Sequence, residues 1–134
     1  MSATIADYMS TDVVSFSPDE DIVLAMRALL DRQLSGAPVI DEDGELVGIL
    51  SQKDCFAIVY HSAYHQDTAG PVRQYMNRDV ECLQADCSVV DAAEKFLQSN
   101  FRRFPVMRDG KVIGLIARRD ILRALDENYL RAGA

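Results

Sequence analysis

The chain has 134 residues, 49% of them hydrophobic, which is enough for one domain with a real core. Its formal net charge of −7 argues against a nucleic-acid partner, because such binding draws on clustered Lys and Arg. No stretch reaches the ~20 apolar residues that span a bilayer and the first residues lack a signal-peptide pattern, so we expect a cytoplasmic protein without a membrane partner.

The first predicted elements are a helical turn at residues 5–9 and an extended segment at 13–16. A helix should follow, because Ser17 can cap its start, Pro18 suits the first helical position and Glu20 completes a capping box. Apolar residues then recur at spacings of 0, 3, 4, 7 and 8, the pattern of one buried helix face. This stripe consists of Ile22, Ala25, Met26, Leu29 and Leu30.

A β-hairpin is expected next. Strands at 36–40 and 46–50 flank the residues Asp41–Gly44, whose Asp-Gly pair is typical of a hairpin turn. A second helix should begin near Ser51, and its apolar residues are Phe56, Ile58 and Val59.

The second half of the chain repeats this pattern. Pro38 aligns with Pro105 at an offset of 67 (105 − 38), and Gly48 aligns with Gly114 at an offset of 66 (114 − 48). A long period present twice predicts two copies of one unit, each too small to bury a core well alone. The second buried stripe is Val89, Ala92, Ala93, Phe96 and Leu97, and the last helix is expected from about Arg118 to Leu130.

We therefore expect an α+β fold with two tandem β-α-β-β-α repeats, at residues 1–66 and 67–134. The repeats should pack through their sheets with pseudo-two-fold symmetry, which predicts two related clefts. Function is to be sought in these clefts.

Several strings carry a resemblance to a known family. They are Ile5–Ser10, Ser35–Asp41 and Gly48–Asp54 in the first half, and Tyr75-Met76, Phe104–Val106 and Gly114–Asp120 in the second. In this order and spacing, the chain resembles a tandem pair of CBS domains, the regulatory module first named from cystathionine β-synthase.

The resemblance implies a function. It suggests a stand-alone regulatory protein, not an enzyme, whose clefts bind an adenine nucleotide or a related ligand: AMP, ADP, ATP or S-adenosylmethionine. No further cofactor is implied. The family also implies a homodimer that passes ligand occupancy, as in energy sensing, to an unidentified protein effector.

The motif at residues 51–54 follows a strand and opens a helix, where backbone N–H groups face outward and favour phosphate. Ser51 can donate to a phosphate oxygen, and Asp54 can accept both ribose hydroxyls, the role that the family assigns to it. The alternative is a plain capping box in which Asp54 accepts from the Ser51 backbone, and the two interpretations overlap. The first predicted ligand site contains Ser51, Lys53, Asp54, Val80, Cys82, Arg103, Phe104 and Pro105.

The second predicted site differs from the first. It keeps Gly114 and Asp120 but has Ala117 where the hydroxyl should be, so Arg118 and Arg119 either compensate as phosphate ligands or are simply solvated. In both sites the residues around a proline would form the adenine slot, or that proline only marks a strand edge. The second site contains Val14, Ser15, Gly36, Ala37, Pro38, Ala117, Arg118, Arg119 and Asp120.

Two other classes of function stay open. A ligand-independent scaffold for dimerisation and partner docking would explain Ala117. A metal- or redox-responsive sensor would use His61 and His65, which stand four positions apart, together with Asp67 and the cysteines. The three cysteines are an odd number at no zinc-like spacing, however, so we expect reduced thiols and no metal site.

Overall fold

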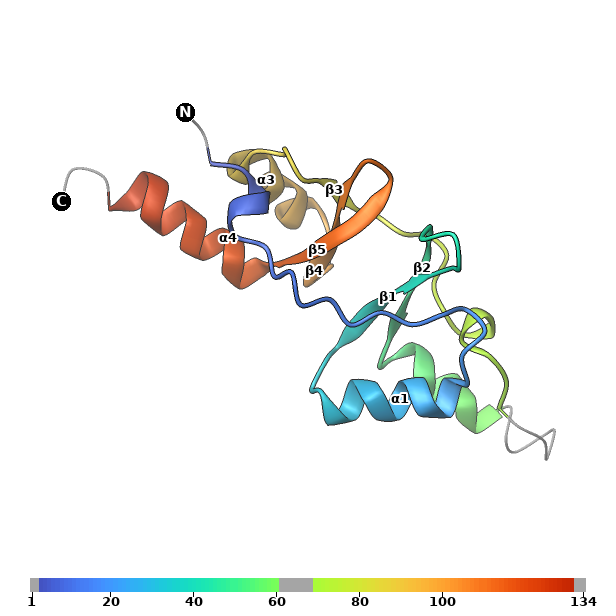
Figure 1. Cartoon of the computed structure of the whole chain (residues 1–134). Coiled ribbons are helices and arrows are strands. Elements are labelled where there is room, and N and C mark those ends of the chain that lie inside the picture. Colours follow the sequence, from blue (N-terminus) through green and yellow to red (C-terminus); the bar gives the residue numbers. More distant parts are fainter. Residues whose placement is uncertain (1–2, 61–68, 132–134) are drawn as a thin grey trace. The chain divides into compact units, whose positions relative to one another are not determined.

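The computed structural model describes residues 3–60 and 69–131 and is shown in Figure 1. The chain forms two compact units. Unit 1 contains the described residues up to Val13 together with those from Glu81 onward, and unit 2 runs from Val14 to Val80. The boundary between the repeats at residues 66 and 67 stays a prediction, and the histidines of the sensor hypothesis, with Asp67, lie outside the described residues.

Unit 2 is built on a β-hairpin covered by a helix. Helix α1 (Ile22–Asp31) precedes strands β1 (Gly36–Ile40) and β2 (Leu46–Ser51), which pair antiparallel as predicted. Phe16 forms a parallel bridge with Val39 and is the one bridged residue of the extended segment predicted there. The helix begins after β2 as a short 3-10 turn, η2 (Asp54–Ala57), and a second one, η3 (Val72–Gln74), follows later. The buried core is Phe16, Ile22, Ala25, Leu29, Ala37, Val39, Leu50, Cys55, Val72 and Tyr75.

The start of α1 corrects one prediction. Its capping residue is Asp21, whose Oδ1 accepts from the N–H of Val23 at 2.8 Å, and Ser17 only closes a local turn. The N–H of Ile22 donates to the carbonyl of Gly70, and Asp21 forms an isolated antiparallel β-bridge with Pro71. Residues 17–20 therefore form a turn and not the first turn of the helix, and the cap lies four positions later than predicted, at Asp21.

Unit 1 repeats this architecture with a complete sheet. Its elements are η1 (Ile5–Asp7), β3 (Leu83–Gln84), α3 (Val89–Gln98), β4 (Arg103–Arg108), β5 (Lys111–Ala117), α4 (Arg118–Leu125) and a π-helical turn η4 (Asp126–Leu130). The strand order is β3-β4-β5, with β3 parallel and β5 antiparallel to β4. The blue first turn η1 lies beside α3 and α4 in Figure 1, and it delivers Ile5 to the core of this unit. That core also contains Leu83, Ala85, Val89, Ala92, Phe104, Val106, Ile116, Ile121 and Ala124.

Each helix stripe was predicted one residue too wide. Leu30, at the last position of the first stripe, is 56% exposed, and Leu97, its counterpart, is 87% exposed. The buried face of α1 and α3 therefore ends one residue earlier, at Leu29 and at the partly buried Phe96, and the same apolar position is left at the surface in both units.

Two glycines let a neighbouring segment join each hairpin at its edge. Leu115 in β5 exchanges two backbone hydrogen bonds with Ser10, at 2.8 and 2.9 Å, and Ile49 in β2 does the same with Asn77. A Cβ on Gly114 would lie 2.8 Å from the Ser10 carbonyl oxygen, so only glycine admits this approach.

Within residues 3–60 and 69–131, no helix has the length and apolar character needed to cross a bilayer.

Candidate functional site

The turn that follows β2, which we call the Asp54 half-site, consists of Ser51, Lys53 and Asp54. Oδ2 of Asp54 accepts from the backbone N–H of Ser51 at 2.9 Å, and the Ser51 hydroxyl oxygen accepts from the N–H of Asp54 at 3.1 Å. The capping box is thus closed from both sides. Oδ1 of Asp54 has no hydrogen-bond partner in the described part of the chain, and the side chain is only partly buried. The carboxylate therefore caps the turn and still offers an oxygen to a ligand.

The turn that follows β2 leads into a helix. The 3-10 turn Asp54–Ala57 continues as α-helix at residues 58–60. The first backbone N–H groups of a helix favour negative charge, so they add to what the side chains of this half-site offer a phosphate. Lys53 is exposed beside the turn and carries the positive charge of this half-site.

The equivalent turn in unit 1, the Asp120 half-site, consists of Ala117, Arg118, Arg119 and Asp120. Oδ2 of Asp120 accepts from the N–H of Ala117 at 2.8 Å, and the eight-residue helix α4 follows directly. Ala117 has no hydroxyl, so the second hydrogen bond of the capping box, which Ser51 makes in unit 2, has no equivalent here. The two half-sites therefore share the carboxylate and its geometry but differ in the group available to a phosphate.

The two arginines of the Asp120 half-site have different surroundings. Arg118 is turned back onto the preceding loop, where its Nε donates to the carbonyl of Phe101 at 3.3 Å and Nη2 to that of Asn100 at 3.5 Å. Arg119 is exposed and, over the described ranges, has no hydrogen-bond or ion-pair partner. Of the two, Arg119 is the one whose guanidinium is open to an anion.

The other predicted residues of unit 2 lie along β1 and just before it. Gly36 pairs with Ser51 in the hairpin, and Ala37 and Pro38 are buried. The N–H of Phe16 donates to the carbonyl of Pro38, which brings Val14 and Ser15 alongside the strand. Val80, from the first predicted site, is half-buried.

The predicted residues of unit 1 lie on β4 or ahead of β3. The ring of Phe104 is 1% exposed and packs edge-on against Phe96 and Phe101, so it belongs to the core and is not free to stack on adenine. Pro105 is buried, and Cys82 is half-buried. Arg103 pairs with Ala117, and its Nε is buried without an acceptor among the described residues.

Sequence reasoning missed two residues near Asp120. Nη2 of Arg123 lies 3.9 Å from Oδ1 of Asp120, and the same guanidinium contacts Tyr8. The spacing of three positions between Asp120 and Arg123 is a helical ion-pair signal that was available in the sequence. The contact with Tyr8 spans 115 positions and had no local signal.

The thiols of Cys55 and Cys87 lie in surroundings that raise their pKa. Burial raises the pKa of the Cys55 thiol, and the carboxylate of Asp54 raises it further. Burial likewise raises the pKa of Cys87, with Asp91 and Asp86 adding to the effect. A raised pKa lowers the thiolate fraction, which is the nucleophile and the metal ligand. No group of three or more potential metal ligands occurs in the described ranges.

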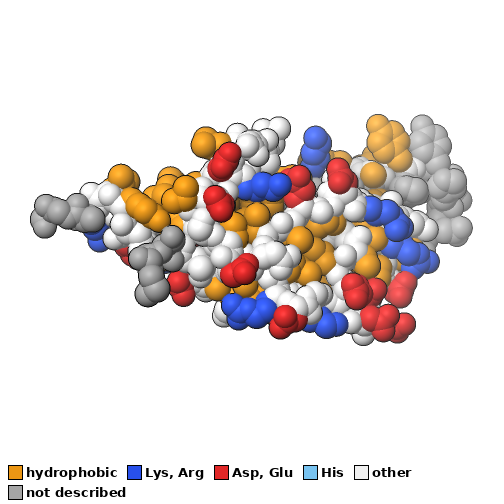
Figure 2. Space-filling model, turned by 90° about the horizontal axis from the view of Figure 1, so that it is seen from above, with side chains coloured by type: hydrophobic (Ala, Val, Ile, Leu, Met, Phe, Trp, Pro, Cys, Tyr) orange, Lys and Arg blue, Asp and Glu red, His pale blue; other side chains and the backbone are white. Residues whose placement is uncertain are grey.

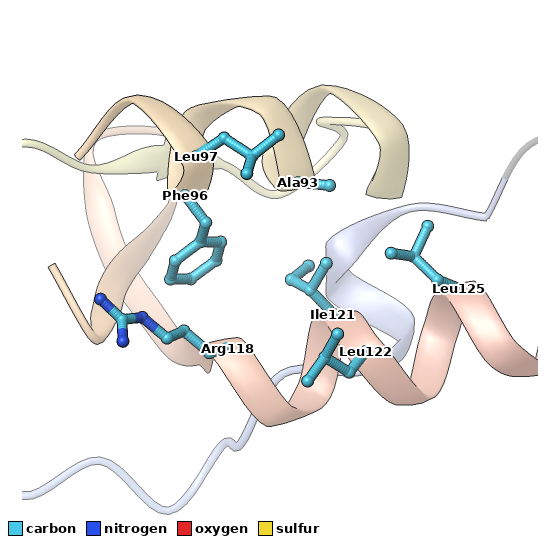
Figure 3. Close-up of a pocket in the computed structure, with 7 residues that line it drawn as sticks. All are labelled: Ala93, Phe96, Leu97, Arg118, Ile121, Leu122 and Leu125. Carbon is cyan, nitrogen blue, oxygen red and sulfur yellow. The ribbon is translucent and has the colours of Figure 1, made fainter. Parts of the chain in front are cut away.

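An apolar groove of about 360 Å³ opens between α3 and α4, and no carboxylate is among the residues that line it. Figure 3 shows Phe96 and Leu97 of α3 facing Ile121 and Leu122 of α4 across it, with Arg118 at one end. Its lining is almost entirely hydrocarbon, which is suited to another apolar surface and not to a nucleotide phosphate. The lining residues are Ala93, Phe96, Leu97, Arg118, Ile121, Leu122 and Leu125.

Comparison with known proteins gives consistent matches. The model of the CBS domain matches residues 5–61 and 72–127. The CBS-pair protein CBSX2 from Arabidopsis thaliana is 26% identical, with a TM-score of 0.81 over 95% of this chain and 96% of its own. The structure of CBSX2 in complex with AMP is 28% identical, with a TM-score of 0.80 over 92% of this chain and 96% of that one.

Relatives differ in how much of their own length is shared. An uncharacterised protein from Methanocaldococcus jannaschii is 30% identical over 90% of both chains. Inosine-5'-monophosphate dehydrogenase from the same organism is 33% identical over 84% of this chain, but the match spans 21% of the enzyme. The activity of that enzyme is therefore not transferred by the match.

Proposed function

This chain belongs to the CBS domain family, with two such domains covering most of its length, and we propose that it is a regulatory module for an adenosine-containing nucleotide. The ligand is an AMP, ADP or ATP type of molecule whose ribose hydroxyls donate to Asp54 or Asp120. Binding of this ligand favours one conformation of the chain, and an effector protein that contacts the chain responds to this conformation.

The observation that carries this proposal is the closed capping box at Ser51 and Asp54. Its two mutual hydrogen bonds position the carboxylate, while Oδ1 stays without a partner in the described residues. A positioned acceptor has less side-chain freedom to lose on binding than a mobile one. The AMP complex of CBSX2 supports the ligand class.

Arg103 adds support for an anionic ligand. A buried N–H that lacks an acceptor leaves its desolvation penalty of about 1–3 kcal/mol uncompensated. A phosphate oxygen would be a charge-assisted acceptor for the Nε of this side chain. The assignment of Val80, Cys82 and Arg103–Pro105 to the same ligand as Asp54 stays a prediction.

A thermal-shift panel on ligand-stripped protein tests the proposal. AMP, ADP, ATP and S-adenosylmethionine are the probes, GMP tests the base, and 2',3'-dideoxy-AMP lacks the hydroxyls that Asp54 would accept. A ligand at 100 times its dissociation constant should stabilise the chain by about 2.7 kcal/mol, or several degrees. We expect an adenine nucleotide to shift the midpoint and the dideoxy analogue to fail. Equal midpoints across the whole panel would contradict the proposal.

A second candidate function, a dimerisation scaffold, is favoured by the exposed apolar residues on the helices. Leu30 and Leu97 occupy equivalent positions (97 − 30 = 67), as do Phe56 and Leu122 (122 − 56 = 66), and all four are exposed. Both repeats thus keep large apolar side chains at the same surface positions. In Figure 2, hydrophobic side chains lie at the surface over the end that carries α4. We propose that a second copy of the chain covers the exposed apolar side chains of unit 1, Leu97 on α3 and Leu122 on α4.

Leu97→Glu is expected to separate such a homodimer into monomers, because it places a charge at the rim of the α3–α4 groove. Light scattering coupled to gel filtration at micromolar concentration measures the mass. Leu24→Glu is the matched control, since Leu24 is also exposed but its counterpart (24 + 67 = 91) is the polar Asp91. A monomeric wild-type chain, or equal effects of both variants, would count against this face.

A further inference from the structure

The Asp120 half-site contains a guanidinium that the Asp54 half-site lacks. Nη2 of Arg123 lies 3.9 Å from Oδ1 of Asp120, whereas the equivalent position in the first repeat (123 − 66 = 57) is Ala57. Oδ2 of Asp120 already accepts from the N–H of Ala117. Oδ1 is therefore the oxygen that a ribose hydroxyl would use, and Arg123 stands next to it.

Tyr8 contacts the same guanidinium. Cζ of Arg123 lies 5.5 Å from the centroid of the Tyr8 ring, within cation–π range, and Nη2 donates to the Tyr8 carbonyl at 3.4 Å. The ring is itself anchored to the end of the last helix. Its hydroxyl donates to Oε2 of Glu127 at 2.9 Å and accepts from Nδ2 of Asn128 at 2.8 Å.

The ion pair between Arg123 and Asp120 is longer than the ion pair between Arg131 and Asp126. Nη2 of Arg131 approaches Oδ2 of Asp126 to 2.7 Å, a closed charge-assisted hydrogen bond. No aromatic ring is found against Arg131 in the part of the chain that the structure describes. The arginine that is held by a ring is thus the one that stays away from its carboxylate.

We propose that Tyr8 is a positioning residue for the Asp120 half-site. It keeps Arg123 from closing onto Asp120, so that Oδ1 remains open to a ribose hydroxyl. This inference rests on the proposed function. This arrangement belongs to one half-site only, because Ala57 stands at the position equivalent to Arg123 (123 − 66 = 57). Tyr75, the counterpart of Tyr8 (8 + 67 = 75), donates its hydroxyl to the carbonyl of Ala69.

Calorimetric binding of adenosine to full-length protein carrying Asp54→Ala tests this inference, because only the Asp120 half-site then keeps its carboxylate. Tyr8→Leu removes the ring, frees Arg123 to pair with Asp120, and should weaken adenosine binding about two- to fivefold, the range of an exposed ion pair. Tyr8→Phe keeps the ring and should bind as the parent does. Adding Arg123→Ala to Tyr8→Leu should restore affinity, which a merely structural loss would not allow.

Each other outcome is decisive. Equal adenosine affinity with and without the Tyr8 ring, or a loss that Arg123→Ala does not rescue, overturns the positioning role and leaves the proposed function intact. Adenosine binding to the wild-type chain but not to the Asp54→Ala background overturns it too, because Asp120 then holds no ribose. If neither adenosine nor any nucleotide of the thermal-shift panel binds the wild-type chain, the proposed function itself fails, and the inference fails with it.

Discussion

Asp54→Ala is expected to weaken AMP binding at the Asp54 half-site by about 10- to 100-fold, because it removes the acceptor of the ribose hydroxyls. Hydrogen bonds to a charged group are worth about 1.5–3 kcal/mol each, and 1.4 kcal/mol corresponds to a factor of ten. The same substitution breaks the capping box, since Oδ2 no longer accepts from the N–H of Ser51. Loss of a cap lowers the free energy of unfolding by about 1 kcal/mol. Isothermal titration with AMP measures the affinity, and urea unfolding measures the stability.

Ser51→Ala is the matched control for this variant. It breaks the same capping box from the other side, because the hydroxyl that accepts from the N–H of Asp54 is lost, but it leaves the carboxylate in place. Adenosine, which has no phosphate, should bind Ser51→Ala as it binds the wild type, whereas AMP should bind more weakly. Equal AMP affinity in wild type and Asp54→Ala would contradict the role of Asp54 in nucleotide binding and would favour the scaffold function.

Gly114→Ala is expected to lower the free energy of unfolding by about 1–3 kcal/mol, the usual result of forcing an atom into a packed site. The new Cβ would lie 2.5 Å from Sδ of Met9 and 2.8 Å from the carbonyl oxygen of Ser10. Ser10 is held there by its two hydrogen bonds with Leu115. The segment must therefore move away from β5, and urea denaturation should show an earlier midpoint.

The flexible and rigid parts of this clash can be separated. Met9→Ala in the Gly114→Ala background removes the sulfur but leaves the Ser10 carbonyl, so it should recover only part of the loss. The equivalent pair in unit 2 differs, because a Cβ on Gly48 would meet the nearest backbone atom at 3.0 Å and mostly contacts Met76. Met76→Ala should then rescue Gly48→Ala more fully. A Gly114→Ala chain as stable as the wild type would show that residues 9–10 do not lie against β5.

Much of the fold was readable in the sequence because the signals are local. Both hairpins, the eight-residue α4 and the mutual bonds of Ser51 and Asp54 depend on residues that are at most 15 positions apart (51 − 36). The period of 67 residues then predicted that the second half would copy the first. The family match and the structures of CBSX2 confirm the α+β tandem CBS pair.

The ligand sites were predicted less completely. The carboxylates and their capping geometry followed from the motif, but the burial of the Phe104 ring and the contacts of Arg118 with loop carbonyls depend on packing. Tyr8 and Arg123 come together across 115 positions, and no local pattern marks such a pair. Contacts of this kind are set by which segments share a core.

The sequence by itself determined the repeated unit, its strands and helices, and the two carboxylates. Only the tertiary structure decided where each opening segment packs: Ile5 of the first repeat joins the core of unit 1, and Val72 of the second repeat joins the core of unit 2. The two segments are alike in sequence, so local propensity does not distinguish their partners. Long-range contacts decide which core each segment joins. The carbonyl of Gly70 accepts from the start of α1, the carbonyl of Glu20 accepts from the start of η3, and a backbone segment lies close to Gly48 and to Gly114.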